Sequence, residues 1–355
     1  MTSPPVSDTL IATDALIVGA GPAGLFQAFE LGLLGIRSHI VDALPHVGGQ
    51  CIELYPDKPI YDIPALAVCT GRELVARLQQ QAAPFDPVFH LGQEVSMVEP
   101  AADGSGFAVR TSAGTVFDTK TILLAAGVGA FKPRRLKIEG LDRFEDTQVF
   151  HRLRAPETYA GQAVLVVGGD DAALEAALAV ATAGARVTLA YRREPLPASE
   201  SVVARFASAR AAGALHFLAG QVSGIVVEDD RLTAAEMLDS QGQTQTVPLD
   251  TMLVLQGLSP RLGPIADWGL VLARKQVPVD TESFATAVPG IYAVGDINTY
   301  PGKKKLILSA FHECTLAAFG AAARIFPGQP IQLQYTTTST RLHQLLGVGA
   351  ATPSD

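Results

Sequence analysis

A glycine pattern between an apolar run and a helix-like segment places the strongest constraint on the fold. The run Ala15–Val18 has the composition of a buried parallel strand, and Pro22–Leu34 has the apolar spacing of a helix. Between them, Gly19, Gly21 and Gly24 form the pattern G-x-G-x-x-G. In such a turn the glycines allow a tight bend, the approach of a diphosphate, and close packing of helix on strand. The segment is therefore predicted to hold a dinucleotide at the helix N-terminus.

The same order of elements returns at 164–191, as a strand, a glycine turn, an alanine-rich helix and a second strand. Each copy is followed by a run of short alternating strands, and 355 residues suffice for two domains. The predicted fold class is α/β, with two Rossmann-like (three-layer ββα) dinucleotide-binding domains. We expect the second domain, 128–284, to be inserted into a split first domain, 1–127 and 285–355, which includes a C-terminal extension.

An acid follows the first glycine turn. Asp42 ends the predicted strand Ser38–Val41, 23 residues after Gly19. A carboxylate there accepts hydrogen bonds from the adenosine ribose and repels a 2′-phosphate. A later strand ends in Gly295-Asp296, and in two-domain flavoproteins this aspartate meets the ribityl and diphosphate side of FAD. The first domain is therefore predicted to bind FAD.

Arginines take the place of the acid in the second copy. The same offset of 23 residues from Gly168 gives Tyr191, which is followed by two arginines. Guanidinium groups bind phosphate in a bidentate manner, so this exchange favours the 2′-phosphate of NADP over NAD. The residues predicted to bind NADPH are Gly168, Gly169, Ala173, Arg192 and Arg193.

One residue conflicts with that prediction. Asp170 occupies the place of the middle glycine of the second turn. Its charge is expected to repel the diphosphate, by up to about 4 kcal/mol at 4 Å and an effective dielectric constant near 20. Two hypotheses follow: either NADPH binding is weakened, or the turn is shifted so that Asp170 points away.

The chain resembles the thioredoxin-reductase-like, or type 2, ferredoxin–NADP reductases over nearly its whole length. The strings that carry the resemblance are Gly48-Gly49-Gln50, Leu54–Pro64 (LYPDKPIYDIP), Thr299–Ser309 (TYPGKKKLILS) with Phe311-His312-Glu313, and Tyr335–Ser339 (YTTTS). True thioredoxin reductases carry a redox-active CxxC before the second glycine turn, where this chain has His151-Arg152-Leu153-Arg154. Without a dithiol, electrons must leave directly from the flavin.

The resemblance implies a reaction and a set of binding residues. NADPH passes a hydride to FAD, and the reduced flavin passes single electrons to ferredoxin or flavodoxin; the family also runs in reverse. No residue is expected to act as a catalytic acid, base or nucleophile, and Tyr55 is expected to stack on one face of the flavin. Either Tyr335 or His343 is expected to cover the other face, often across a dimer. The residues expected to bind FAD are Gly19, Gly21, Gly24, Asp42, Gln50, Tyr55, Val95, Phe131, Asp296 and Thr337.

Charge and composition bear on partners and location. The net charge of −8 argues against a nucleic-acid partner, but basic residues near the flavin, Lys303–Lys305 and the group Lys132, Arg134, Arg135 and Lys137, are candidates for docking an acidic electron carrier. The three cysteines show no metal-ligand spacing. We expect a cytoplasmic protein with no membrane span or signal peptide.

Two other functions remain open from the sequence. One is an NAD(P)H diaphorase that reduces quinones, free flavins or iron chelates. The other is a flavin-binding redox sensor with impaired NADPH turnover, an alternative that Asp170 keeps open. The physiological acceptor and the direction of electron flow also stay undetermined at this stage.

Overall fold

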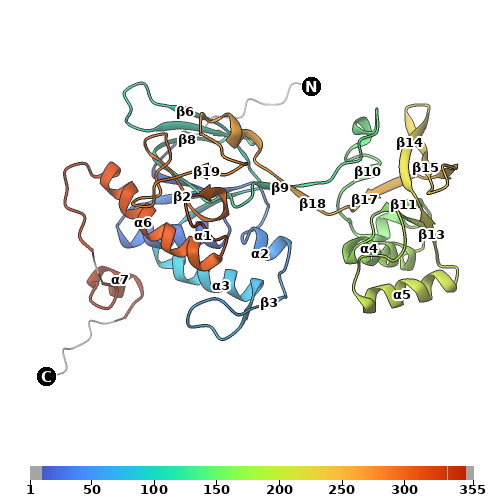
Figure 1. Cartoon of the computed structure of the whole chain (residues 1–355), viewed down its shortest axis with the longest axis horizontal. Helices are drawn as coiled ribbons and strands as arrows, with labels where there is room; N and C mark the ends of the chain where they lie inside the picture. The colour runs from blue at the N-terminus through green and yellow to red at the C-terminus, as the bar shows by residue number, and fades with distance from the viewer. Residues whose placement is uncertain (1–9, 334, 349–355) are drawn as a thin grey trace. The chain divides into compact units, whose positions relative to one another are not determined.

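The structure is a computed structural model that describes residues 10–333 and 335–348 (Figure 1). It divides the chain into two compact units, Met1–Ala130 with Pro260–Asp355, and Phe131–Ser259. Residues 260–284 lie in the first unit, where Ile265 and Trp268 are buried beside Val95, whereas the sequence interpretation grouped them with the inserted domain. The connections β9 (Ala130–Pro133) and β18 (Leu258–Arg261) pair with each other.

The first unit is built on a seven-stranded sheet in the order β5-β2-β1-β8-β7-β6, with β20 beside β8. Strands β5, β2, β1, β8 and β20 are parallel, whereas β6 and β7 run antiparallel in a meander. Its strands in this sheet are β1 (Leu10–Val18), β2 (Ser38–Asp42), β5 (Val88–Leu91), β6 (Val95–Pro100), β7 (Phe107–Thr111), β8 (Val116–Leu124) and β20 (Ile291–Ala293). Its helices are α1 (Pro22–Leu33), α2 (Gln50–Glu53), α3 (Gly71–Ala82), α6 (Ile307–Ile325) and α7 (Thr340–Leu345). Short elements complete it: β3 (Pro59–Ile60), β4 (Cys69–Thr70), β19 (Val277–Pro278), β21 (Asn298–Thr299) and the 3₁₀ turns η1 (Ala83–Phe85), η4 (Gly263–Asp267) and η5 (Gly295–Ile297).

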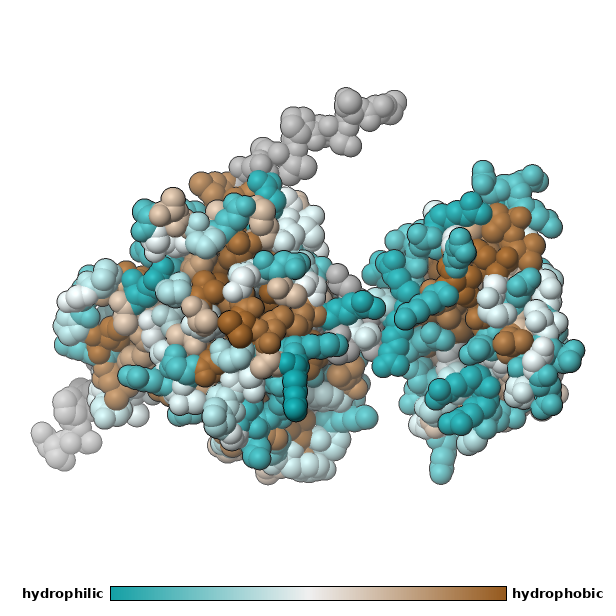
Figure 2. All heavy atoms as spheres, turned by 45° about the horizontal axis from the view of Figure 1, so that its top comes forward, coloured by the Kyte–Doolittle hydropathy of each residue, from teal (hydrophilic) through white to brown (hydrophobic). Residues whose placement is uncertain are grey.

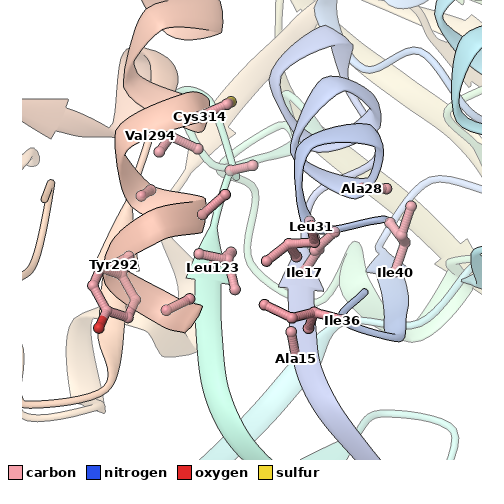
Figure 3. Close-up of a cluster of buried hydrophobic side chains, with 14 of the residues drawn as sticks. Ala15, Ile17, Ala28, Leu31, Ile36, Ile40, Leu123, Tyr292, Val294 and Cys314 are labelled. Atoms are coloured by element: carbon pink, nitrogen blue, oxygen red, sulfur yellow. The ribbon is translucent and has the colours of Figure 1, made fainter. Parts of the chain in front are cut away.

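Alternate residues of β1 pack on opposite faces of this sheet, as the two-residue period of a strand requires. Ala15 and Ile17 pack with α1 and α6 in a cluster that includes Leu31 and Cys314 (Figure 3). The intervening residue Leu16 packs with the meander on the other face. The unit therefore has three layers: helices, parallel sheet and meander.

The second unit repeats this three-layer plan. Its parallel sheet has the order β10-β17-β11-β12-β13, and a three-stranded antiparallel sheet β14-β15-β16 covers one face. Helices α4 and α5 cover the other face. The strands are β10 (Val149–Phe150), β11 (Ala163–Val167), β12 (Arg186–Tyr191), β13 (Leu215–Ala219), β14 (Gln221–Glu228), β15 (Arg231–Leu238), β16 (Thr244–Pro248) and β17 (Thr251–Val254). The helical elements are η2 (Asp142–Phe144), η3 (Pro156–Tyr159), α4 (Asp171–Thr182) and α5 (Glu200–Ala211). The predicted fold class is confirmed.

On the face shown in Figure 2, both units carry apolar patches among hydrophilic side chains. In the described part of the chain, no helix has the length and apolar character needed to cross a membrane.

Candidate functional site

The first glycine turn lies between β1 and α1. Gly19 has a φ of +113°, and a Cβ there would overlap the carbonyl of Ala125 at the end of β8. A Cβ on Gly24 would overlap the carbonyl of Gly19. By contrast, a Cβ on Gly21 would have its nearest neighbour, the Cα of Gly49, at 3.9 Å. Gly19 and Gly24 are thus required by the fold itself, whereas Gly21 leaves space for a ligand.

The N-terminus of α1 is open. Its N-cap residue is Gly21, which provides no side-chain hydrogen bond, and Pro22 begins the helix. The glycine pair Gly48-Gly49 faces this N-terminus. The N–H of Gly48 donates to the carbonyl of Ala20 at 2.9 Å, and Gly49 has a φ of +52°. Free N–H groups and the helix dipole favour an anion at such a place. The open helix N-terminus and the facing glycines therefore suit a diphosphate.

The carboxylate of Asp42 supports the same turn from the end of β2. Its Oδ2 accepts a hydrogen bond from the N–H of Ala20 at 2.6 Å, and its Oδ1 accepts one from Leu44 at 2.8 Å. Burial raises the pKa of Asp42, and these two hydrogen bonds oppose the rise. Each carboxylate oxygen keeps a second lone pair, so Asp42 can also accept a ribose hydroxyl.

Three segments meet at the other end of this site. The side chain of Gln50 donates to Oδ2 of Asp296 at 3.4 Å, and a Cβ on Gly127 would be 3.0 Å from Nε2 of Gln50. Tyr55 is half-buried, its hydroxyl accepts a hydrogen bond from the thiol of Cys51 at 3.6 Å, and burial raises its pKa. The structure therefore brings Gln50, Tyr55 and Asp296 to the side of the sheet where the glycine turn lies.

The remaining residues expected at the FAD site are placed differently. Val95 is buried at the start of β6, and the side chain of Phe131 lies outside the described residues. Thr337 is exposed, in the segment that precedes α7. That segment belongs to a tail whose Arg341 guanidinium lies against Gly35, just beyond the C-terminal end of α1. Because α1 has 12 residues, or about 18 Å of helix, Gly35 is far from the glycine turn at its other end.

The second glycine turn lies between β11 and α4. A Cβ on Gly168 would overlap the carbonyl of Leu255 and approach Ala173. A Cβ on Gly169 would be 2.6 Å from the ring of Tyr191. The turn is thus as tight as the first one, and the aromatic ring at the end of β12 packs directly on it.

Asp170 is the N-cap residue of α4. Its Oδ1 accepts a hydrogen bond from the N–H of Ala173 at 3.1 Å. The following residue, Asp171, points elsewhere, because its carboxylate accepts hydrogen bonds from the backbone and the hydroxyl of Ser199. The helix N-terminus is therefore occupied by a carboxylate of the chain itself, and in this respect the second site fits a diphosphate less well than the first.

The arginines at the end of β12 are exposed. The guanidinium of Arg192 lies 5.8 Å from the centre of the Tyr191 ring. Arg193 is also exposed and has no ion pair with any residue that the structure describes. Both arginines follow the strand that borders the second glycine turn, where a 2′-phosphate is expected.

The place of the thioredoxin-reductase dithiol holds a histidine–carboxylate pair. Nε2 of His151 is 2.8 Å from Glu145, and Nδ1 is 3.3 Å from the carbonyl of Val254. The three cysteines are free, buried, and all in the first unit.

The proposed docking lysines are not equivalent. The side chain of Lys303 is only 6% exposed and pairs with the fully buried Glu313, so the expectation that it belongs to a docking surface is wrong. Lys304 and Lys305 are exposed. Lys303 differs from Lys304 and Lys305 because its ammonium group is held by Glu313, a relationship that a run of three identical residues does not reveal.

Fold and site together define an oxidoreductase with two dinucleotide-binding units. The family described as "Pyridine nucleotide-disulphide oxidoreductase" matches residues 13–314. A protein of Polaromonas naphthalenivorans named "Ferredoxin--NADP reductase" is 58% identical over 345 residues, covering 96% of this chain and 94% of the relative. One of the same name from Paracidovorax citrulli is 56% identical over 356 residues, covering 97% and 99%. The chain belongs to the ferredoxin–NADP reductases within the pyridine nucleotide-disulphide oxidoreductase family, which confirms the resemblance seen in the sequence.

Solved structures confirm the fold alone. Thioredoxin reductase of Lactococcus lactis superimposes with a TM-score of 0.57 at 24% identity, covering 88% of this chain and 99% of the other. Bacillithiol disulfide reductase of Staphylococcus aureus gives a TM-score of 0.61 at 19% identity, with the same coverage.

Proposed function

We propose that the chain passes electrons between NADPH and ferredoxin or flavodoxin through FAD, without a dithiol. The observation that carries this proposal is the contrast between two similar glycine turns. The first is followed by Asp42, and the second by Tyr191 and two exposed arginines. A ribose without a 2′-phosphate suits the acid, and a 2′-phosphate suits the arginines.

FAD is assigned to the first unit. The open N-terminus of α1 and the space above Gly21 accept its diphosphate, and Asp42 accepts a ribose hydroxyl. Gln50 and Asp296, which are hydrogen-bonded to each other, would hold the ribityl and flavin end, and Tyr55 would contact the ring. Bound FAD supplies the chemistry that converts a two-electron donor into a one-electron donor, while the chain binds and orients it.

NADPH is assigned to the second unit. The turn at Gly168, Gly169 and Ala173 receives the diphosphate, and Arg192 and Arg193 bind the 2′-phosphate. Asp170 must give up its hydrogen bond to Ala173 or move before a diphosphate can use that N–H. The carboxylate of Asp170 therefore competes with the diphosphate for the N–H of Ala173.

Electrons leave for an acidic carrier protein. The relatives' names supply ferredoxin as that carrier, and flavodoxin is its equivalent in charge and function. Lys304 and Lys305 are exposed just beyond the Gly295-Asp296 turn, so they can attract an acidic partner towards the flavin. The cytoplasm is the proposed location.

A second copy of the chain completes the site. The tail that contains Thr337 lies against the far end of α1, and Tyr335 is 69% exposed. A tail placed in this way is suited to cover the flavin of a partner subunit, with Tyr335 or His343 as the covering ring. A homodimer is therefore part of the proposal.

A flavin-binding sensor with weak NADPH turnover is the second candidate, because Asp170 caps α4 where the diphosphate binds. A comparison of acceptors separates the functions. We expect NADPH-driven reduction of ferredoxin to have a much higher kcat/KM than that of quinones or free flavin. Similar values for all acceptors would favour the diaphorase, and no turnover with any of them would favour the sensor.

A further inference from the structure

A carboxylate lies on the buried face of α6. Glu313 is 0% exposed and sits on the same stripe as Ala310, Cys314 and Ala317, which are also buried. A buried carboxylate is unfavourable unless charged or polar groups donate to it. Its donors therefore show what the residue holds in place.

Among the residues that the structure describes, its donors all come from one short segment, 295–303. Oε2 accepts hydrogen bonds from the backbone N–H of Gly295 at 2.7 Å and from Nδ2 of Asn298 at 2.8 Å. Oε1 accepts one from the hydroxyl of Tyr300 at 3.0 Å and pairs with the ammonium group of Lys303. The side chain of Glu313 thus binds four residues of a nine-residue segment.

The ion pair engages both polar backbone groups of Gly295. The N–H donates to Glu313, and the carbonyl accepts a hydrogen bond from Nζ of Lys303 at 2.8 Å. Gly295 has a φ of +77°, and a Cβ there would be 3.3 Å from the Cβ of Ala23 in the first turn of α1. The ion pair of Glu313 and Lys303 therefore fixes the position of the Gly295 turn next to the first glycine turn.

The next residue along the chain is Asp296, which faces the proposed FAD site through its hydrogen bond with Gln50. We infer that Glu313 and Lys303 are positioning residues that hold the Gly295-Asp296 turn in its FAD-binding geometry and so slow the loss of FAD. This inference rests on the proposed assignment of FAD to the first unit. It extends that assignment to two residues that do not contact the cofactor.

The chain offers a matched control. Tyr300→Phe removes one donor to the same carboxylate but leaves both bonds to Gly295, and it keeps the ring that lies 5.4 Å from Nζ of Lys303. Glu313→Gln removes the charge and replaces an acceptor by a donor, and Lys303→Met removes the ammonium group at similar length. A role limited to general stability predicts losses in all three variants in proportion to the bonds removed.

The test is the rate at which FAD leaves the full-length protein, followed by the recovery of FAD fluorescence after dilution. We expect Glu313→Gln and Lys303→Met to release FAD about tenfold faster or more, and Tyr300→Phe to stay within about twofold. We also expect the effect of Glu313→Gln to be largely absent in an Asp296→Ala background, because residues that act through one another are not additive. Equal release rates for all variants, or additive effects, would overturn the inference.

A measurement on the unaltered chain covers the case in which the variants do not fold. After FAD is stripped from the wild-type protein, the amide of Gly295 should stay protected from hydrogen exchange, because the pair already holds the turn. Exchange as fast as that of an open loop would overturn the inference. A wild-type protein that carries no FAD contradicts the proposed function instead, so the two failures are distinguishable.

Discussion

Oδ1 of Asp170 accepts a hydrogen bond from the backbone N–H of Ala173 across the first turn of α4, with 3.1 Å between the two atoms. The corresponding N-cap residue of α1 is Gly21, which has no side chain to do this. Each helix follows a glycine turn at the end of a parallel strand. The N-terminus of α1 is open, whereas the N-terminus of α4 holds a carboxylate. We therefore expect the NADPH site to be the weaker of the two proposed sites.

Replacing Asp170 should strengthen binding of the nicotinamide cofactor. We predict that Asp170→Gly lowers the Kd for NADPH about tenfold, because it removes a charge that repels the diphosphate. The lost cap should cost only a few tenths of a kcal/mol. Asp170→Asn keeps the cap and removes the charge, so calorimetric titration of both variants separates repulsion from lack of space. An unchanged Kd in both variants contradicts the competition between Asp170 and the cofactor.

The first glycine turn allows ligand binding to be separated from folding. Gly21→Ala should change the free energy of unfolding of the FAD-free protein by about 1 kcal/mol or less, since the new Cβ meets no protein atom closer than 3.9 Å. The same variant should purify with little FAD. Gly24→Ala should lower the free energy of unfolding by about 3 kcal/mol or more, because its Cβ overlaps Gly19.

Urea denaturation and the flavin absorbance of the purified proteins check both variants. If Gly21→Ala keeps its full FAD content, the diphosphate does not lie over Gly21.

Much of this site is predictable from local sequence. Two turns, an acid and two arginines could be located because the spacing from glycine to strand end is the same in both copies. The contact between Gly49 and Gly21 depends on tertiary structure, and the local sequence does not indicate it. The local sequence does indicate a role for Glu313, because it lies on the apolar stripe of a helix, where an acid needs a partner. Lys303, ten residues earlier, was expected at the surface as part of the run Lys303–Lys305, because nothing in three identical residues marks the first as buried.

The exposed lysines should govern the salt dependence of ferredoxin reduction. We predict that the double variant Lys304→Gln/Lys305→Gln lowers the rate roughly tenfold at low ionic strength and flattens its decline with salt. The control is Lys120→Gln, which removes an exposed lysine elsewhere in the first unit. Steady-state rates over a range of salt concentrations provide the measurement. A double variant with the salt dependence of the wild type shows that ferredoxin docks elsewhere.

Glu30 should make stability depend on pH. Burial raises its pKa to about 6 from the ordinary value of 4.5, although a hydrogen bond from Thr315 opposes the rise. The folded state then holds the proton more tightly than the unfolded state, so the contribution of Glu30 to stability is fully present below about pH 4.5 and is lost as the pH rises to about 6. We predict that Glu30→Gln is more stable than wild type at pH 7 by about 1–2 kcal/mol, after allowance for partial exposure.

The two proteins should be equally stable near pH 4, so urea denaturation at both pH values measures the effect as a difference. A stability difference that stays the same at both pH values rules out titration of Glu30 as its cause.

The proposed function is tested most directly by an anaerobic titration of the purified yellow protein with NADPH, followed by addition of oxidised ferredoxin. Each chain is proposed to carry one flavin and to use no redox-active dithiol. We predict that the flavin absorbance bleaches with about one equivalent of NADPH per FAD, the two-electron capacity of a flavin alone. We also predict that NADH bleaches the flavin poorly and that ferredoxin restores the colour. Uptake of a second equivalent, bleaching by NADH as readily as by NADPH, or a flavin that NADPH leaves yellow would contradict the proposed function.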